Sequence, residues 1–207
     1  ALARFGFSHG AAEHLFDVVN DRTRPEILPD ALAEIAALMA EPHDERLLDL
    51  RLVVDTDFGY LPKRIAAFVR YRQGLADLRA SRRAWATRLF DAIPRKTPHD
   101  AKALYALGVD DLRRQEDAAA VGRLRAALAH PEASRETRNR SRLALARVLD
   151  ELERYAAADA MYRRVEVPEL TAAEGELLLE RAWTAYWRGD HRDAMGLLYA
   201  LEAPSYR

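Results

Sequence analysis

The strongest constraint on this 207-residue chain is a fourfold recurrence of small, large and proline residues. Small residues recur 34, 38 and 36 residues apart, at Gly74, Gly108, Ala146 and Ala182. Twelve residues after each stands an alanine, and four further on a large apolar residue: Ala86 and Phe90, Ala120 and Leu124, Ala158 and Tyr162, Ala194 and Leu198. Prolines follow at Pro94, Pro131, Pro168 and Pro204. Such a period predicts stacked repeats of one supersecondary unit.

Each repeat reads as two antiparallel helices. Ala, Leu, Arg and Glu dominate, and only nine Gly and nine Pro occur. These residues favour helix, and no stretch alternates long enough to predict a strand convincingly. The best strand candidate, residues 52–54, continues the pattern from Leu47 and reads better as a helix end. The small residues let the paired helices approach, and the large residue fills the gap between pairs. The sequence therefore predicts an all-α fold.

The pattern resembles the tetratricopeptide repeat, a helix-turn-helix unit of 34 residues. The best match runs from Ala182 to Ala194, with Gly189-Asp190 at the turn between the helices. The resemblance covers about two-thirds of the chain and implies an α-α superhelix, a solenoid of antiparallel helix pairs. We expect four pairs within residues 62–207, at about 62–95, 98–131, 135–168 and 171–204.

The chain departs from the family pattern at several places. Asp77 and Asp111 stand where the family has a large helix-A residue, and Leu78 and Leu112 follow one step later. The alignment of the first helix of each pair (helix A) with the family pattern is therefore fixed only to within one residue. Arg181 holds a position that is usually aliphatic. Extra residues in the second and third units predict longer turns between repeats, around residues 132–137 and 166–171.

Residues 1–61 form a separate, irregular helical region in this reading. Residues 11–20 and 30–41 look amphipathic, with a Pro-containing loop at 21–29 between them. Residues 45–54 would add a further helix. The region is either a degenerate repeat or a cap, because terminal repeats are often atypical.

Two motifs could carry chemistry. Gly6 to Gly10 fits a nucleophile elbow around Ser8, but that motif needs a strand before it and partners on later strands. The favoured reading is a helix start with Ser8 as the N-cap, and Ser8→Ala should leave function untouched. Asp55, Asp57 and Gly59 resemble the opening of a calcium loop, but Ala66 stands where the bidentate Glu belongs. We predict no catalytic residue, no metal and no cofactor.

The net charge and the lengths of the apolar runs limit the kinds of partner that the chain can bind. A formal net charge of -1 gives no general attraction to nucleic acid or anionic membranes. No apolar run is long enough to span a membrane. The absence of cysteine excludes disulfides and thiol catalysis. The chain starts at Ala1 without an initiator Met, so we expect a fragment or a processed product, and the compartment stays open.

The resemblance implies a binding groove lined by the first helix of each pair. Its residues would be Tyr71, Leu75, Arg79, Tyr105, Val109, Arg113, Arg147, Trp183 and Trp187. Aromatic and Arg side chains often anchor protein interfaces. At least one of Trp183, Tyr186 and Trp187 should instead pack between helices. The family's clamp for chaperone tails needs Lys and Asn where this chain has Tyr71 and Leu75, so a co-chaperone of that kind is not expected.

The prediction is a non-catalytic scaffold or adaptor that binds a peptide or helix of a partner protein within a multiprotein assembly. The Ala- and Arg-rich repeats are similar to bacterial members of the family, some of which belong to cell-envelope machinery. The envelope, including the periplasm, is therefore slightly favoured over the cytoplasm. The alternative is a regulatory or assembly-chaperone domain for an envelope complex. A remote alternative is a hydrolase that uses Ser8.

Overall fold

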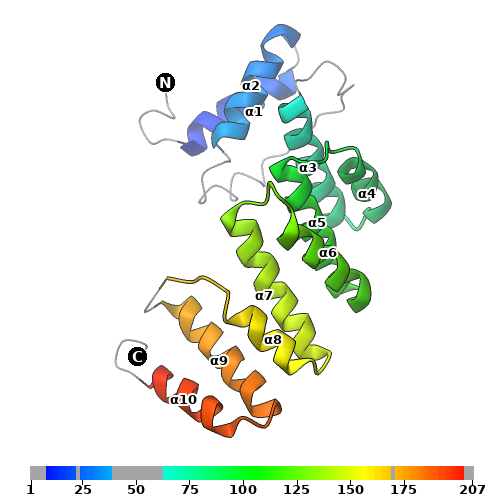
Figure 1. Cartoon of the computed structure of the whole chain (residues 1–207). Coiled ribbons are helices and arrows are strands. Elements are labelled where there is room, and N and C mark those ends of the chain that lie inside the picture. Colours follow the sequence, from blue (N-terminus) through cyan, green and yellow to red (C-terminus); the bar gives the residue numbers. More distant parts are fainter. Residues whose placement is uncertain (1–7, 22–23, 39–62, 169–170, 203–207) are drawn as a thin grey trace. The chain divides into compact units, whose positions relative to one another are not determined.

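The computed structural model describes residues 8–21, 24–38, 63–168 and 171–202, and every regular element in these ranges is helical (Figure 1). The predicted all-α class is confirmed for this part of the chain. The chain divides into two compact units, residues 1–100 and 101–207, which we describe separately. The predicted boundary at 61 and 62, the helix at 45–54 and the Asp55–Gly59 loop lie outside the described residues.

The first unit begins with two helices that cover the first helix pair. Phe16, Val19, Leu32, Ile35 and Val69 form one apolar core with their neighbours. The N-terminal helices therefore share a core with α3 rather than standing alone. The elements of this unit are α1 (Ser8–Asp21), the 3-10 turn η2 (Pro25–Ile27), α2 (Leu28–Leu38), α3 (Lys63–Arg79) and α4 (Arg83–Asp91).

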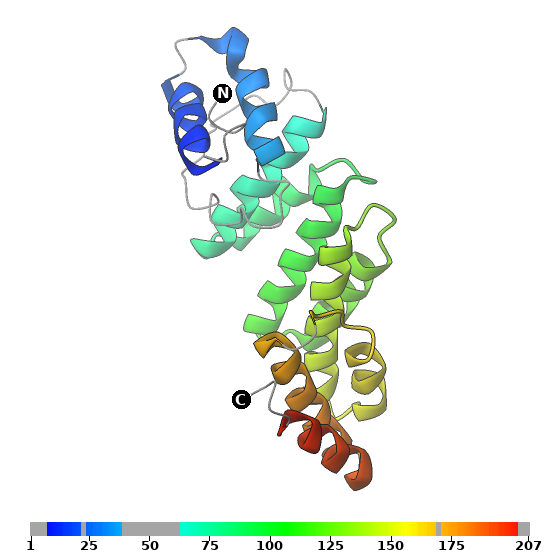
Figure 2. The same ribbon diagram turned by 90° about the vertical axis from the view of Figure 1, so that its left-hand side faces the viewer.

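The second unit continues the paired arrangement. α5 (Pro98–Arg113) begins at the end of the first unit and runs into the second. The remaining helices are α6 (Asp117–Ala129), α7 (Arg135–Glu151), α8 (Tyr155–Tyr162), α9 (Ala172–Trp187) and α10 (His191–Leu201). Figures 1 and 2 both show α9 and α10 lying antiparallel, side by side. Val121, Leu145, Leu149, Tyr162 and Leu177 belong to a core that joins α6 to α9.

The small residues of the repeat lie at close helix contacts. A Cβ built on Gly74 would stand 2.3 Å from a ring carbon of Phe90, and one on Gly108 would stand 2.9 Å from Leu124 Cγ. Only glycine therefore fits without a shift of the facing side chain. Ala146 is also completely buried. The small positions of the repeat thus face the paired helix.

The turn inside each pair has the same backbone geometry four times. Seven residues after each small residue, the chain adopts a positive φ, at Ser81 (59°), Gln115 (60°), Glu153 (58°) and Gly189 (85°). The next N–H donates to the carbonyl oxygen five residues earlier, with N–O distances of 2.7 to 2.9 Å. A left-handed residue with this hydrogen bond is a common helix C-terminal turn. The sequence repeat is therefore matched by a backbone repeat.

Side-chain caps begin four of the later helices. At α5 the Asp100 N–H donates to Thr97 Oγ1, with an N–O distance of 3.3 Å. Ser134 Oγ accepts a hydrogen bond from the Thr137 N–H, Thr171 from the Glu174 N–H, and Asp190 from the Asp193 N–H. These caps pair N–H groups that have no partner inside the helix.

Of the two longer turns that the sequence predicts between repeats, the first is wrong. The connection between α6 and α7, residues 130–134, is shorter than the 92–97 connection between α4 and α5. The extra residues of the second repeat lengthen its second helix instead, since α6 has 13 residues whereas α4, the second helix of the first repeat, has 9. The connection from α8 to α9, at 163–171, is longer, as expected. Among the described helices, none is both long and apolar enough to cross a membrane.

Candidate protein-binding surface

One face of α9 exposes four large apolar side chains, which we call the aromatic face. Leu179, Trp183, Tyr186 and Trp187 have exposed fractions of 44, 54, 48 and 60%. Their spacing of four, three and one residues places them on one side of the helix. Solvated helix faces normally carry polar residues, so this face is a candidate for contact with a partner.

The three rings of the aromatic face touch one another. The Tyr186 ring lies 6.0 Å from Trp183 and 5.3 Å from Trp187, with interplanar angles of 87° and 77°. Edge-to-face contacts of this kind are favourable and hold the rings in place. None of the three rings is fully buried, but Tyr186 packs between helices in part, as predicted for at least one of them, because its ring also lies 5.4 Å from that of His191 at the start of α10. The buried side of α9 holds the small residues Ala182 and Ala185, which leave the large rings outside.

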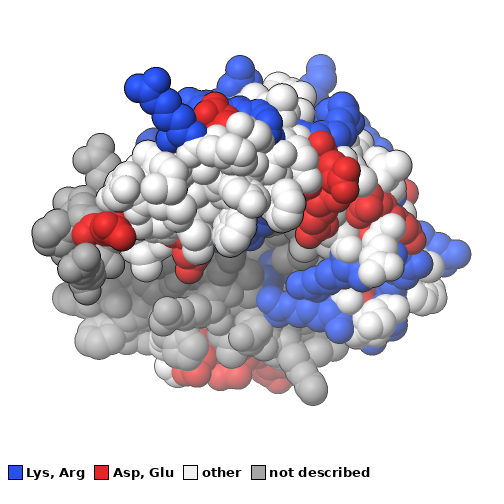
Figure 3. All heavy atoms as spheres, turned by 90° about the horizontal axis from the view of Figure 1, so that it is seen from below, with Lys and Arg blue, Asp and Glu red and all other residues white. Residues whose placement is uncertain are grey.

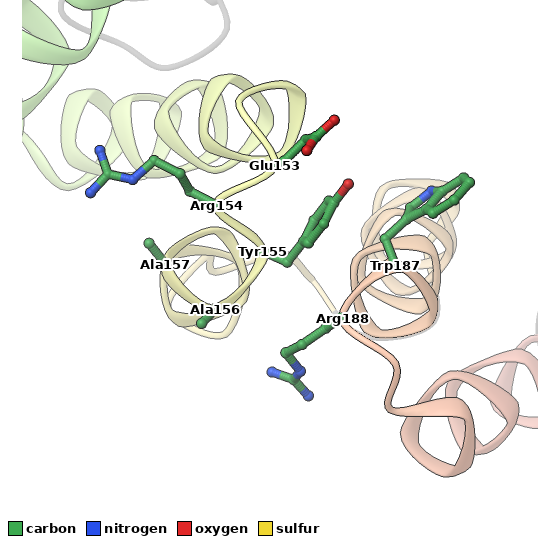
Figure 4. Close-up of a pocket in the computed structure, with 7 residues that line it drawn as sticks. All are labelled: Glu153, Arg154, Tyr155, Ala156, Ala157, Trp187 and Arg188. Carbon is green, nitrogen blue, oxygen red and sulfur yellow. The ribbon is translucent and has the colours of Figure 1, made fainter.

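A shallow hollow of about 460 Å³ adjoins the aromatic face at Trp187. In Figure 4, Tyr155 stands between Glu153 and Trp187, while Arg188 points away on the other side of the chain. The hollow thus offers two aromatic walls with an acidic group close by. Its lining residues are Glu153, Arg154, Tyr155, Ala156, Ala157, Trp187 and Arg188.

Ion pairs from α7 fix the position of α9. The Arg147 guanidinium binds the Glu180 carboxylate with two nitrogens, at distances from 2.6 to 3.1 Å. Burial and the neighbouring Glu180 carboxylate raise the pKa of Tyr162, so its hydroxyl stays protonated and hydrogen-bonded to Glu180. Two-nitrogen Arg–carboxylate pairs are the geometrically specific kind. The aromatic face is therefore carried by a helix held in a defined position.

A second ionic cluster ties α8 to α9 and α10. Asp159, only 8% exposed, accepts hydrogen bonds from Arg163 at 2.9 Å and from Arg188 at 2.8 Å. Arg163 also binds Asp193, at 3.2 Å. Burial raises the pKa of the Asp159 carboxyl, but the hydrogen bonds and charges of the two guanidinium groups outweigh burial and hold it below its ordinary value. Asp159 is therefore a charged, buried joint between helix pairs.

Three of the predicted groove residues lie in the first unit, on α3. Tyr71 is half-buried, and its ring lies 6.1 Å from Phe90 and 5.8 Å from His99, so it takes part in packing. Leu75 is half-buried and Arg79 is exposed in the last turn.

The other six lie in the second unit. On α5, Tyr105 is half-buried against the core, Val109 is half-buried and Arg113 is exposed. On α7, Arg147 is exposed but its charge is bound to Glu180. Only Trp183 and Trp187 come together, through the ring of Tyr186.

The prediction missed Leu179 and Tyr186 on the aromatic face, and Tyr155 in the hollow. Leu179 lies four residues before Trp183, so helical spacing alone could have found it. Tyr155 had no such signal, because it comes from the start of α8.

Neither the possible metal ligands among the described residues nor comparison with known proteins identifies a further site. Within the described residues, no group of three or more His, Asp or Glu side chains is placed to hold a metal ion. A helix does start at the predicted place, but Ser8 is the first helical residue of α1 rather than its N-cap, and residues 1–7 lie outside the described part. Comparison of the chain with family models, curated proteins and solved structures finds no match.

Proposed function

We propose that this chain is a non-catalytic protein-binding module of the tetratricopeptide type. It holds an extended peptide or a helix of a partner protein on the aromatic face of α9. The observation that carries the proposal is the exposure of Trp183, Tyr186 and Trp187 on one side of one helix. Trp and Tyr are the side chains most often found at energetic hot spots of protein interfaces.

The repeated geometry supports the tetratricopeptide assignment. Four helix pairs share the small residue of the first helix, the left-handed turn residue seven positions later and the alanine of the second helix. The first helices of such pairs bear the binding face in that family, and α9 is the first helix of the fourth pair. The face of α9 is thus where the proposed fold would bind a partner.

The hollow indicates how the ligand would sit. A partner side chain entering between Tyr155 and Trp187 would be enclosed by two rings, with Glu153 beside them. Aromatic-walled grooves suit apolar or proline side chains of an extended peptide. The ligand then continues over Trp183 and Leu179 along α9. Placement in a cell-envelope assembly, as an adaptor or an assembly chaperone, remains a prediction from the sequence.

The experiment uses peptides selected from a random-sequence library for binding to the intact chain. Their affinities are then measured for the Trp187→Ala and Trp85→Ala variants. Trp85 lies on α4 in the first unit and has the same 60% exposure as Trp187. Binding that depends on Trp187 and not on Trp85 supports the proposal. Peptides that bind both variants equally well would refute it.

A further inference from the structure

A second exposed apolar surface lies on α10 and is separate from the aromatic face. From Ala194 to Leu201 the helix has no charged residue, yet Met195, Leu198 and Tyr199 are 49, 41 and 63% exposed. A helix that is apolar all round is normally buried all round. Figure 3 views the end at which α10 lies in Figure 1, and uncharged side chains form a field on part of it, bordered by charged ones.

Comparison with the other second helices shows that this surface is unusual. Leu198 corresponds to Phe90, Leu124 and Tyr162, none of which is more than 2% exposed. Tyr199 corresponds to Asp91, Arg125 and Arg163, which are all charged and exposed. Tyr199 is thus an aromatic residue at a position that the other three pairs leave to water.

The chemistry of the surface also differs from the α8 joint. Asp159 and Arg163 of α8 bind charged groups of the following pair. Met195 and Tyr199 replace them at the corresponding positions of α10. Whatever covers α10 therefore needs no charge at the centre of the contact.

Two opposite charges bound the apolar centre. Arg192 and Glu202, both exposed, lie three residues before Met195 and three residues after Tyr199. At 100° per residue they share one side of the helix with Met195 and Tyr199. Their signs oppose the helix dipole, which favours acids at the first turn and bases at the last. An antiparallel copy of the same helix would place Arg192 opposite Glu202 at both edges.

End-to-end stacking of copies does not fit the first unit. Such stacking would set α10 of one copy against α3 of the next. α1 and α2 already cover α3, in the core that contains Val19, Ile35 and Val69. A head-to-tail contact of α10 with α3 is therefore blocked, whereas a contact of α10 with α10 about a two-fold axis lets the same surface serve both copies.

We infer that α10 joins two copies of this chain into an antiparallel two-fold dimer. Met195, Leu198 and Tyr199 form its centre, and Arg192 of each copy pairs with Glu202 of the other. α10 has 11 residues, whereas stable interfaces use roughly 20 to 30 residues on each side. The dimer is therefore weak and depends on concentration.

Sedimentation equilibrium over a range of protein concentrations tests the dimer. The wild-type chain should approach twice its monomer mass of 23.4 kDa. Tyr199→Glu should remain monomeric, and Trp85→Glu, an exposed aromatic position on α4, should dimerise like wild type. Arg192→Glu and Glu202→Arg should each weaken dimerisation by about tenfold, because they oppose like charges. The double exchange Arg192→Glu/Glu202→Arg should restore it.

A disulfide test covers the case in which a charge variant misfolds. Because the chain has no cysteine, Leu198→Cys gives a single exposed thiol one residue from the two-fold axis that the Arg192–Glu202 pairing sets. Mild oxidation should convert this variant to a covalent dimer much faster than Trp85→Cys. A chain that stays monomeric at all concentrations would overturn the inference. So would a dimer indifferent to Tyr199→Glu, or a double exchange that is no tighter than the single variants.

Discussion

At the scale of single residues, the four left-handed turn positions differ only in their side chains. Gly189 adopts its positive φ without a Cβ, whereas Ser81, Gln115 and Glu153 carry one. A left-handed backbone costs a residue other than glycine about 1 to 2 kcal/mol. Each of these three turns is therefore less stable than the same turn would be with glycine at the left-handed position.

These turns give the first prediction. Gln115→Gly should raise the free energy of unfolding by about 0.5 to 1 kcal/mol, because relief of the left-handed strain exceeds the added entropy of the unfolded chain. Gly189→Ala should lower it by about 1 kcal/mol. Urea unfolding followed by circular dichroism measures both. Changes of the same sign at the two positions would contradict the repeated turn geometry.

The second prediction compares two helical glycines. Gly74→Ala should destabilise the chain by about 1 to 2 kcal/mol, because the added methyl meets the buried Phe90 ring at 2.3 Å. Gly122, in α6, is exposed and a Cβ there would meet nothing within 4 Å. Gly122→Ala should therefore stabilise by about 1 kcal/mol through helix propensity alone. Thermal unfolding distinguishes the two, and stabilisation by both would refute the close contact.

Some features of single residues could be predicted from the sequence, and others could not. Gly74 and Gly108 could be recognised because small side chains at a close helix contact recur at a fixed period. The turn residues Ser81 and Gln115 could not, because their side chains give no sign of a positive φ. The exposure of Trp187 was also hidden, since periodicity does not say whether a neighbouring helix covers a position.

At the scale of elements, the joint between α8 and α9 rests on Asp159. The pKa of Asp159 is lowered in the folded chain, so its stabilisation is present above the ordinary Asp pKa of about 3.9 and is lost as the pH falls through the folded value. Asp159→Asn should cost about 2 kcal/mol near neutral pH. It should also flatten the loss of stability in acid, as measured by urea unfolding at several pH values.

Asp150 provides the matched control. Burial raises the pKa of its carboxyl, although a hydrogen bond from Thr184 acts against burial, and its Oδ1 atom has no hydrogen-bond partner among the described residues. The ionised form is thus disfavoured by folding, and this penalty is relieved as the pH falls. Asp150→Asn should cause little loss of stability near neutral pH, unlike Asp159→Asn. A loss as large as that at Asp159 would mean that the Thr184 hydrogen bond outweighs the cost of burying the charge.

The helices themselves could be predicted better than their connections. Eight helices from α3 to α10 fall inside the four ranges expected from proline and small-residue spacing. The extra length of the second repeat was predicted in the turn after it and lies instead in α6. Extra residues in a helix or in a turn have the same effect on the repeat period, so the period alone could not distinguish them. The burial of Tyr71 and Tyr105 depends on rings and helices far away in the sequence, which the local pattern does not contain.

At the scale of the molecule, the second unit carries both proposed surfaces. The aromatic face belongs to α9 and the dimer face to α10, so one helix pair would serve binding and self-association. A dimer would present two aromatic faces to a partner with repeated binding segments. Such linkage raises apparent affinity without any new contact. Loss of the dimer through Tyr199→Glu should therefore leave the affinity for a single short peptide unchanged.

The central claim, that the aromatic face of α9 binds protein segments, is tested most directly by one comparison of affinities. A peptide selected on the wild-type chain is titrated against Trp187→Ala and Trp85→Ala by calorimetry. Trp187→Ala should weaken binding by about thirtyfold, which is roughly 2 kcal/mol, as at a hot spot. Trp85→Ala, with equal exposure, should bind like wild type. Equal affinity of both variants and the wild-type chain would contradict the claim.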